Sequence, residues 1–151
     1  MPEKATVERA RRDARQGKSS STQAGEFVRE EMHHVREGKH GARSTKQAIA
    51  IGLSKARRAG VKLAPPKKGR ARARTRKQAA RDYRKGQQRH RSAPSSTRSR
   101  AVSRALKREQ HGAASRPALA RHAKQSARKR TRAERSRAAK RAARTRRLHH
   151  Q

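Results

Sequence analysis

The residues of this chain best able to do chemistry are its arginines and lysines, 46 in all against ten aspartates and glutamates. Residues 65–151 contain 31 of these cations and three acids, a formal excess of +28. Arginine outnumbers lysine by 32 to 14, and its planar guanidinium can hold a phosphate through two parallel hydrogen bonds. This pattern predicts binding of a polyanion, above all nucleic acid, through neutralisation of its phosphates.

The candidate phosphate-binding residues lie in three basic stretches. If the stretch from residue 65 onward were fully helical, it would be about 130 Å long. Duplex DNA of that length carries roughly 75 phosphates, so the stretch could neutralise about a third of them, which is enough to coat or condense DNA. The candidates are Lys55, Arg57, Arg58, Lys67, Lys68, Arg70, Arg72, Arg74, Arg76, Arg128, Lys129, Arg130, Arg132, Arg137, Lys140, Arg141, Arg144, Arg146 and Arg147.

Readout of base sequence is not expected. Direct readout needs a rigid helix or strand that presents side chains to base edges. The hairpin could resemble a helix-turn-helix, but its loop is long and the sequence indicates no third helix. Single-strand binding through stacking is also disfavoured, because Phe27 and Tyr83 cannot form the stacking platform of an RRM or OB fold. The sequence therefore favours non-specific binding of duplex DNA, as in nucleoid-associated or histone-H1-like proteins. An RNA- or ribosome-associated role is the alternative, because phosphate contacts do not distinguish the two nucleic acids.

Catalytic, metal and cofactor sites are not expected. The chain has no cysteine, and no HExxH pattern occurs. Adjacent histidines on a helix point in different directions, so the histidines that lie near three glutamates in residues 30–40 are interpreted as solvated. These residues are His33, His34 and His40, with Glu30, Glu31 and Glu37. The prediction is a non-enzymatic protein.

A membrane role is also not favoured. The longest apolar run is Ala48–Leu53, far shorter than the about 20 residues that span a bilayer. The basic stretch lacks the large apolar residues that an interfacial helix needs. The expected location is the cytoplasm, at the nucleoid.

The elements that position these cations begin with a polar helix and linker in residues 1–19. A helical hairpin in residues 20–62 should follow. Its helices would start at two S-x-x-Q capping boxes, Ser20 with Gln23 and Ser44 with Gln47. Gly60 suits the position after the second helix.

The apolar residues of the hairpin form two narrow stripes. They are Phe27, Val28, Met32 and Val35 on the first helix, and Ile49, Leu53 and Ala56 on the second. The alternation of Ile49 and Ile51 would also suit a strand, but the cap and the closing glycine favour a helix. Because these stripes are small, the hairpin could dock a protein partner or self-associate.

Residues 63–151 are expected to form a long, largely disordered tail. Low hydrophobicity combined with high net charge is typical of disorder, and like charges at i,i+4 oppose helix formation. Nucleic acid would neutralise this repulsion, so the tail could become helical when bound. The predicted fold class is thus mostly α, with a short helical hairpin followed by a disordered basic tail.

Two segments carry a resemblance to a known family. Met32-His33-x-Val35-Arg36-Glu37-Gly38-Lys39, followed by the segment from Lys46 to Gly60, resembles a family of small basic bacterial proteins whose core domain has no established function. The Arg/Ala/Ser tail is similar to the extensions of some members and, more broadly, to histone-H1-like bacterial proteins. The resemblance brings no established activity, so the expected function depends on the residues themselves.

Overall fold

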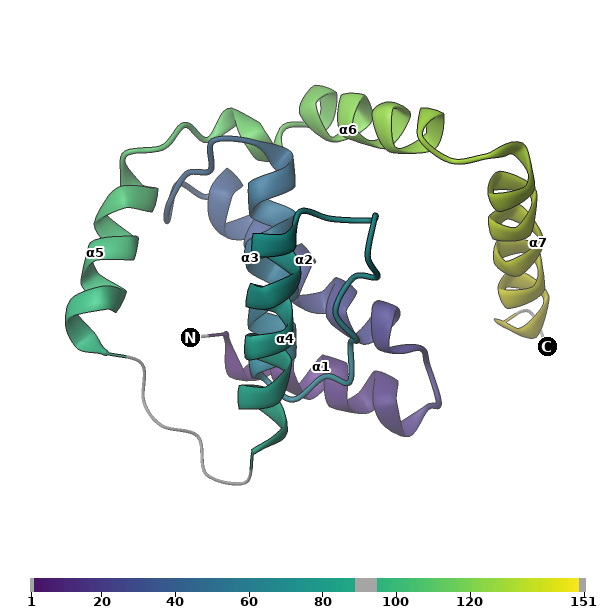
Figure 1. The fold of residues 1–151 in the computed structure, drawn as a ribbon, viewed down its shortest axis with the longest axis horizontal. Helices are drawn as coiled ribbons and strands as arrows, with labels where there is room; N and C mark the ends of the chain where they lie inside the picture. The colour runs from purple at the N-terminus through teal and green to yellow at the C-terminus, as the bar shows by residue number, and fades with distance from the viewer. Residues whose placement is uncertain (1, 89–94, 150–151) are drawn as a thin grey trace. The chain divides into compact units, whose positions relative to one another are not determined.

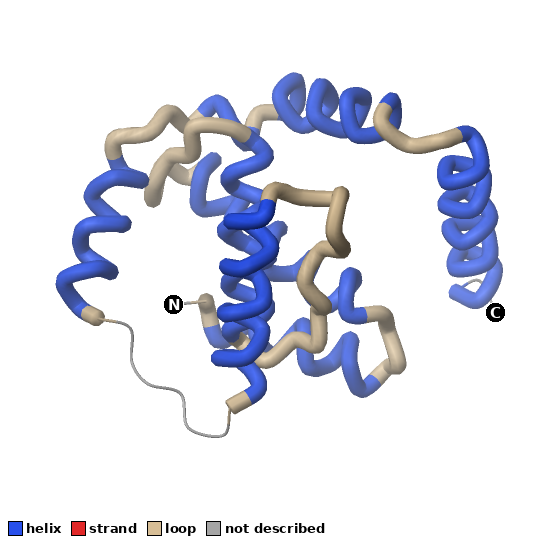
Figure 2. Tube along the Cα trace, in the orientation of Figure 1, coloured by secondary structure: helices blue, strands red, loops and turns tan. Residues whose placement is uncertain are grey.

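Seven α-helices and one short 3-10 helix make up the secondary structure of residues 2–88 and 95–149, which the computed structural model describes (Figure 1). No strand occurs in these residues (Figure 2). The helices are α1 Lys4–Arg15, α2 Ser20–Arg36, α3 Thr45–Arg58, α4 Ala73–Gln87, α5 Ser96–Lys107, η1 Gly112–Ala114, α6 Arg116–Arg128 and α7 Arg132–His149. The chain divides into two compact units, residues 1–115 and 116–151.

The core of the first unit lies where α1, α2 and α3 meet, with α4 packed on α3 (Figure 1). Phe27 and Val35 on α2 are fully buried. Around Phe27 the cluster consists mostly of small side chains, namely Ala10, Ala24, Ala56 and Val61. The predicted helical hairpin is therefore present, and α1 and α4 complete its packing.

Helix α3 packs through a face of small residues. Ala48, Gly52 and Ala56 are buried at i, i+4 and i+8, whereas the predicted contact residues Ile49 and Leu53 are only half-buried. A Cβ at Gly52 would lie 2.7 Å from the Cα of Val28. The two helix backbones thus approach closely. The predicted Ala56 lies in the core and Leu53 packs against it, but the contact face extends to Ala48 and Gly52 in place of Ile49.

The helix ends follow the predicted local chemistry with one shift. Ser44 accepts a hydrogen bond from the Gln47 backbone N–H at 3.2 Å, as predicted. On α2 the cap is Ser19 rather than Ser20. Gly60 has a φ of +99° just after α3, a conformation that glycine adopts without the strain that a Cβ brings.

Residues of the predicted tail hydrogen-bond to the hairpin and pack against it. The Thr45 hydroxyl donates to the Ala113 carbonyl at 2.6 Å, and Arg36 Nε donates to the Ala114 carbonyl at 2.9 Å. On α4, a Cβ at Gly86 would overlap the backbone carbonyl of Arg57. The expected boundary at residues 62 and 63 therefore falls inside the first unit.

The prediction of a largely disordered tail is wrong. Beyond residue 63, helices α4 to α7 account for most of the described residues. The prediction equated the lack of a hydrophobic core with the lack of structure. Arginine and alanine are strong helix formers, and α5 and α6 are helical although they bury no residue.

Among residues 2–88 and 95–149, no helix is both long and apolar enough to cross a bilayer.

Candidate nucleic-acid interface

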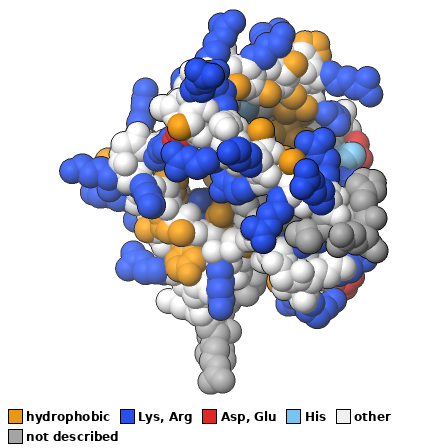
Figure 3. Space-filling model, turned by 90° about the vertical axis from the view of Figure 1, so that its right-hand side faces the viewer, with side chains coloured by type: hydrophobic (Ala, Val, Ile, Leu, Met, Phe, Trp, Pro, Cys, Tyr) orange, Lys and Arg blue, Asp and Glu red, His pale blue; other side chains and the backbone are white. Residues whose placement is uncertain are grey.

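The second unit consists of two helices covered with exposed cations. All ten candidate residues predicted here have exposed side chains, while Glu134 is the only acid. Lys and Arg side chains are numerous and acidic ones few on the face that Figure 3 shows. The exposed candidates are Arg128, Lys129, Arg130, Arg132, Arg137, Lys140, Arg141, Arg144, Arg146 and Arg147.

Helix α7 carries its cations in rows of like charge. Arg137 and Arg141 stand at i,i+4, and so do Lys140 and Arg144. Residues at this spacing are neighbours on a helix, and like charges there destabilise it by about 0.2–0.5 kcal/mol per pair. In the absence of an anion, this surface of α7 therefore repels itself.

A capping box fixes the start of α7. The Glu134 backbone N–H donates to the Thr131 hydroxyl at 3.2 Å, and the Thr131 backbone N–H donates to the Glu134 carboxylate at 3.0 Å. This T-x-x-E pattern marks a helix start, but it was not among the predicted capping boxes. The one acid of the unit is thus engaged in holding the helix end.

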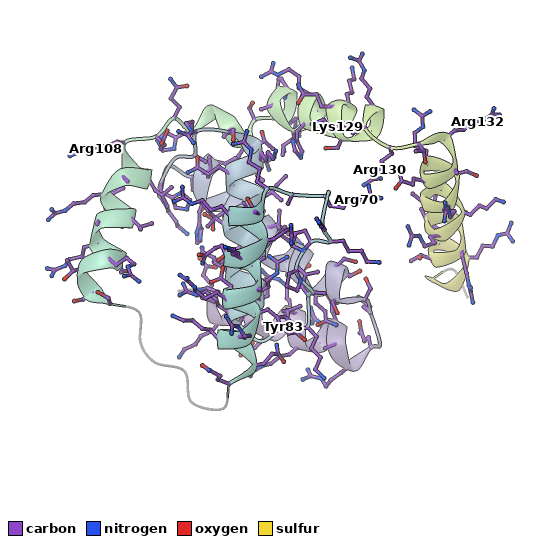
Figure 4. All side chains as sticks on the ribbon, in the orientation of Figure 1. Arg70, Tyr83, Arg108, Lys129, Arg130 and Arg132 are labelled. Atoms are coloured by element: carbon purple, nitrogen blue, oxygen red, sulfur yellow. The ribbon has the colours of Figure 1, made fainter. Side chains whose placement is uncertain are left out.

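The bend between α6 and α7 brings three more cations to the surface. Figure 4 shows Lys129 and Arg130 on this bend and Arg132 at the first residue of α7. Helices α6 and α7 make few contacts with each other, so these cations are not covered by packing within the unit.

The basic segment before α4 is also exposed. Lys67, Lys68, Arg72 and Arg74 are exposed, and so is Arg70, but Arg76 is half-buried. Gly69 turns the chain here with a φ of +84°. This segment is a second basic surface, and it belongs to the first unit.

The three candidates on α3 all contact other parts of the first unit, although the side chain of Arg58 remains 49% exposed. Lys55 Nζ lies 2.6 Å from Glu31 Oε2, and Arg58 Nε lies 3.3 Å from Asp82 Oδ1. Arg57 is 7% exposed, and its guanidinium donates to the Leu63 carbonyl at 3.1 Å. Burial lowers the pKa of Arg57, an effect that the charge of Asp82 partly offsets. The structure thus places these three cations among the contacts that hold the first unit together.

Further exposed cations were not among the candidates. On α5 they are Arg98, Arg100, Arg104 and Lys107, and in the second unit they are Arg116, Arg121, Lys124 and Arg135. The sequence signal for them was their position in the same Arg/Ala/Ser pattern.

The family comparison covers the first three helices. Residues 4–68 match the model of a family of unknown function, DUF6496. This match confirms a core domain of unknown function, and it ends before α4. No curated protein and no solved structure matches the chain.

Proposed function

We propose that this chain is a non-enzymatic protein that binds duplex DNA without regard to sequence and coats it by neutralising phosphates, in the manner of a histone-H1-like, nucleoid-associated protein. The observation that carries the proposal is the surface of α7, where eight Lys and Arg residues accompany one Glu. The principal contact surface would be α7 together with the bend before it.

The dimensions of α7 suit a duplex. Its 18 residues make a helix about 27 Å long and 10–12 Å wide. Roughly 16 phosphates lie along the same length of DNA, and the major groove is about 12 Å wide. Eight cations could thus neutralise about half of the phosphates beside the helix.

The charge arrangement favours binding without sequence readout. Base recognition needs a few side chains directed together at base edges, whereas the cations of α7 occupy most of the helix circumference. Phosphates lie on both sides of a groove, so such a helix can bind in many equivalent positions. Neutralisation would also relieve the repulsion among Arg137, Lys140, Arg141 and Arg144.

A salt titration of the full chain tests the proposal. With about ten engaged cations, log K against log salt should have a slope near −9, and affinity should fall by about five decades between 50 and 200 mM salt. Fluorescence anisotropy with two unrelated duplexes and one structured RNA measures this. A shallow slope, or a 100-fold preference for one duplex, would contradict non-specific coating. A strong preference for the RNA would support the ribosome-associated alternative.

A matched pair of variants locates the interface. Replacing Arg137, Lys140, Arg141, Arg144 and Arg147 by Gln should reduce the slope by about 4–5. The control replaces five exposed cations of α1 and α2 by Gln, namely Lys4, Arg11, Arg12, Arg15 and Arg29. Equal losses in the two variants would show that net charge, rather than α7, determines binding. Sequencing the nucleic acid cross-linked to the protein in cells would test the nucleoid location.

A further inference from the structure

A carboxylate and two imidazoles converge where α2 meets the loop that leads to α3. One ligand atom of each of Glu31, His34 and His40 lies within 4.8 Å of the others. Glu31 and His34 occupy successive turns of α2, and His40 follows Gly38, which turns the chain back with a φ of +73°. Spacing along one helix predicted solvated histidines, but the turn at Gly38 brings His40 to Glu31 and His34.

The carboxylate of Glu31 is fully buried, and it is paired by charge without aligned hydrogen bonds. Its Oε1 lies 3.0 Å from His40 Nε2, and its Oε2 lies 2.6 Å from Lys55 Nζ. Neither contact has the angles of a hydrogen bond, so both buried oxygens lack a hydrogen-bond partner. A buried carboxylate in this condition is costly unless a cation compensates it.

The hydrogen bond of His40 indicates which of its ring nitrogens is available to bind a metal. His40 Nδ1 lies 3.0 Å from the Gly41 carbonyl, which can only accept, so Nδ1 carries a proton. In the neutral ring Nε2 is then an acceptor, and it lies 3.0 Å from Glu31 Oε1, another acceptor. A metal ion between the two atoms would resolve this conflict.

His34 has the surroundings common to metal-binding imidazoles. Its Nε2 lies 2.9 Å from Glu3 Oε1, and metal-bound histidines usually place their second ring nitrogen beside a carboxylate or carbonyl. The hydrogen bond with His34 lowers the pKa of Glu3. The rings of His34 and His40 meet edge to face, with centroids 5.9 Å apart, so the two imidazoles lie close together beside the carboxylate of Glu31.

We propose that Glu31, His34 and His40 bind a divalent transition metal of the Zn²⁺ class. Two imidazoles with one carboxylate are an established donor set for this ion. Tetrahedral coordination requires ligand atoms about 3.3 Å apart. The Glu31–His40 separation of 3.0 Å nearly meets this requirement; the three ligand atoms lie within 4.8 Å of one another, so metal binding would draw the His34 ring closer.

The two histidines are partly exposed, and the carboxylate of the site is held in position. The side chains of His34 and His40 are 13% and 16% exposed, and His34 lines a pocket of about 260 Å³. Lys55 holds Glu31 through Oε2 and leaves Oε1 for the metal. Bound metal would tie α2 to the loop before α3, so it should stabilise the family-matched region.

Titration of the full chain with Zn²⁺ tests the site. His149 and His150 are replaced by alanine in every variant, because adjacent histidines can bind Zn²⁺ adventitiously. We expect one saturable equivalent, a higher Tm with Zn²⁺ and the visible d–d bands of tetrahedral Co²⁺. His34→Ala and His40→Ala should each lower the affinity at least about tenfold. His33→Ala is the matched control, because His33 is exposed on the same helix and lies outside the cluster.

Two results would contradict the metal site. Absence of saturable binding in the chain with only these two replacements, or equal affinities for the His33, His34 and His40 variants, would overturn the proposal. If His34→Ala loses helicity, His34→Gln and His40→Gln keep the comparison, with circular dichroism confirming the fold. These outcomes do not depend on nucleic-acid binding.

Discussion

Helices α3 and α7 both carry cations toward their C-terminal ends, but the two sets meet different surroundings. On α3, Lys55 and Arg58 face carboxylates and Arg57 faces backbone carbonyls. On α7, the cations at 137, 140, 141 and 144 are exposed. Nine of the ten acids precede residue 116. The contrast shows that cations of this chain are engaged within the fold where a carboxylate or carbonyl lies beside them, and are exposed on α7, where acids are scarce.

The largest expected effect tests the packed side of this comparison. Gly52→Leu should destabilise the first unit by more than about 3 kcal/mol, because even a Cβ at this position comes within 2.7 Å of the Val28 backbone. A thermal melt by circular dichroism measures the loss. Gly25→Ala on α2 is the control, since a Cβ there meets no atom within 4 Å, and duplex affinity should not fall in either variant.

The next effect concerns a buried cation. Lys55→Met leaves Glu31 and Glu30, both buried, without their lysine and should cost about 2–3 kcal/mol. Arg144→Met removes an exposed cation and should change stability by less than about 0.5 kcal/mol. Chemical denaturation and duplex titration of both variants form the test. A loss of affinity with unchanged stability in Lys55→Met would place Lys55 at the interface after all.

The fold was predictable where local signals and hydrophobic spacing agreed. The Ser44 cap, the glycine at the end of α3 and the stripe around Phe27 all indicated the hairpin. The extension of the α3 contact face was not predictable, because it depends on the missing side chain of Gly52, which lets two backbones approach. The helices after residue 63 were missed because composition reports on burial, whereas α5 to α7 depend on propensity and caps such as Thr131 with Glu134.

The basic composition of the candidate site was predictable from the sequence. Which of its cations are exposed and which are engaged within the fold was not. The Arg-rich pattern identified the exposed residues of α7. The pattern could not separate the α3 cations from these exposed residues. Lys55 and Arg58 pair with Glu31 and Asp82, each 24 residues away in the sequence. Arg57 donates to a carbonyl of the following loop. The same long-range geometry brings His40 back to Glu31, which spacing along one helix could not show.

A smaller effect tests the local basis of α7. Thr131→Ala removes the hydroxyl of the capping box and should cost the helix about 1 kcal/mol. Amide hydrogen exchange over residues 132–136 should show the loss. Ser136→Ala removes a hydroxyl from an exposed position inside the same helix and should leave exchange unchanged. Equal protection in the two variants would mean that the cap does not hold the helix start.

The smallest expected change in stability comes from reversing one charge on α7. This variant separates two consequences of like charge, repulsion within the helix and binding of DNA. Arg141→Glu places a carboxylate four residues after Arg137 and three before Arg144, so two repulsive contacts become attractive. Each pair should stabilise the helix by about 0.2–0.5 kcal/mol, while the slope of log K against log salt becomes shallower by about 1–2. Arg146→Glu makes the same charge change, but its neighbours at 142 and 143 are alanines, so it should weaken binding without gaining helix. Helicity from circular dichroism and the salt slope, measured on both variants, decide the matter. If Arg141→Glu bound DNA as tightly as the unchanged chain, the cations of α7 would not contribute to DNA binding. If Arg141→Glu lost helicity, repulsion between these cations would not limit the stability of α7.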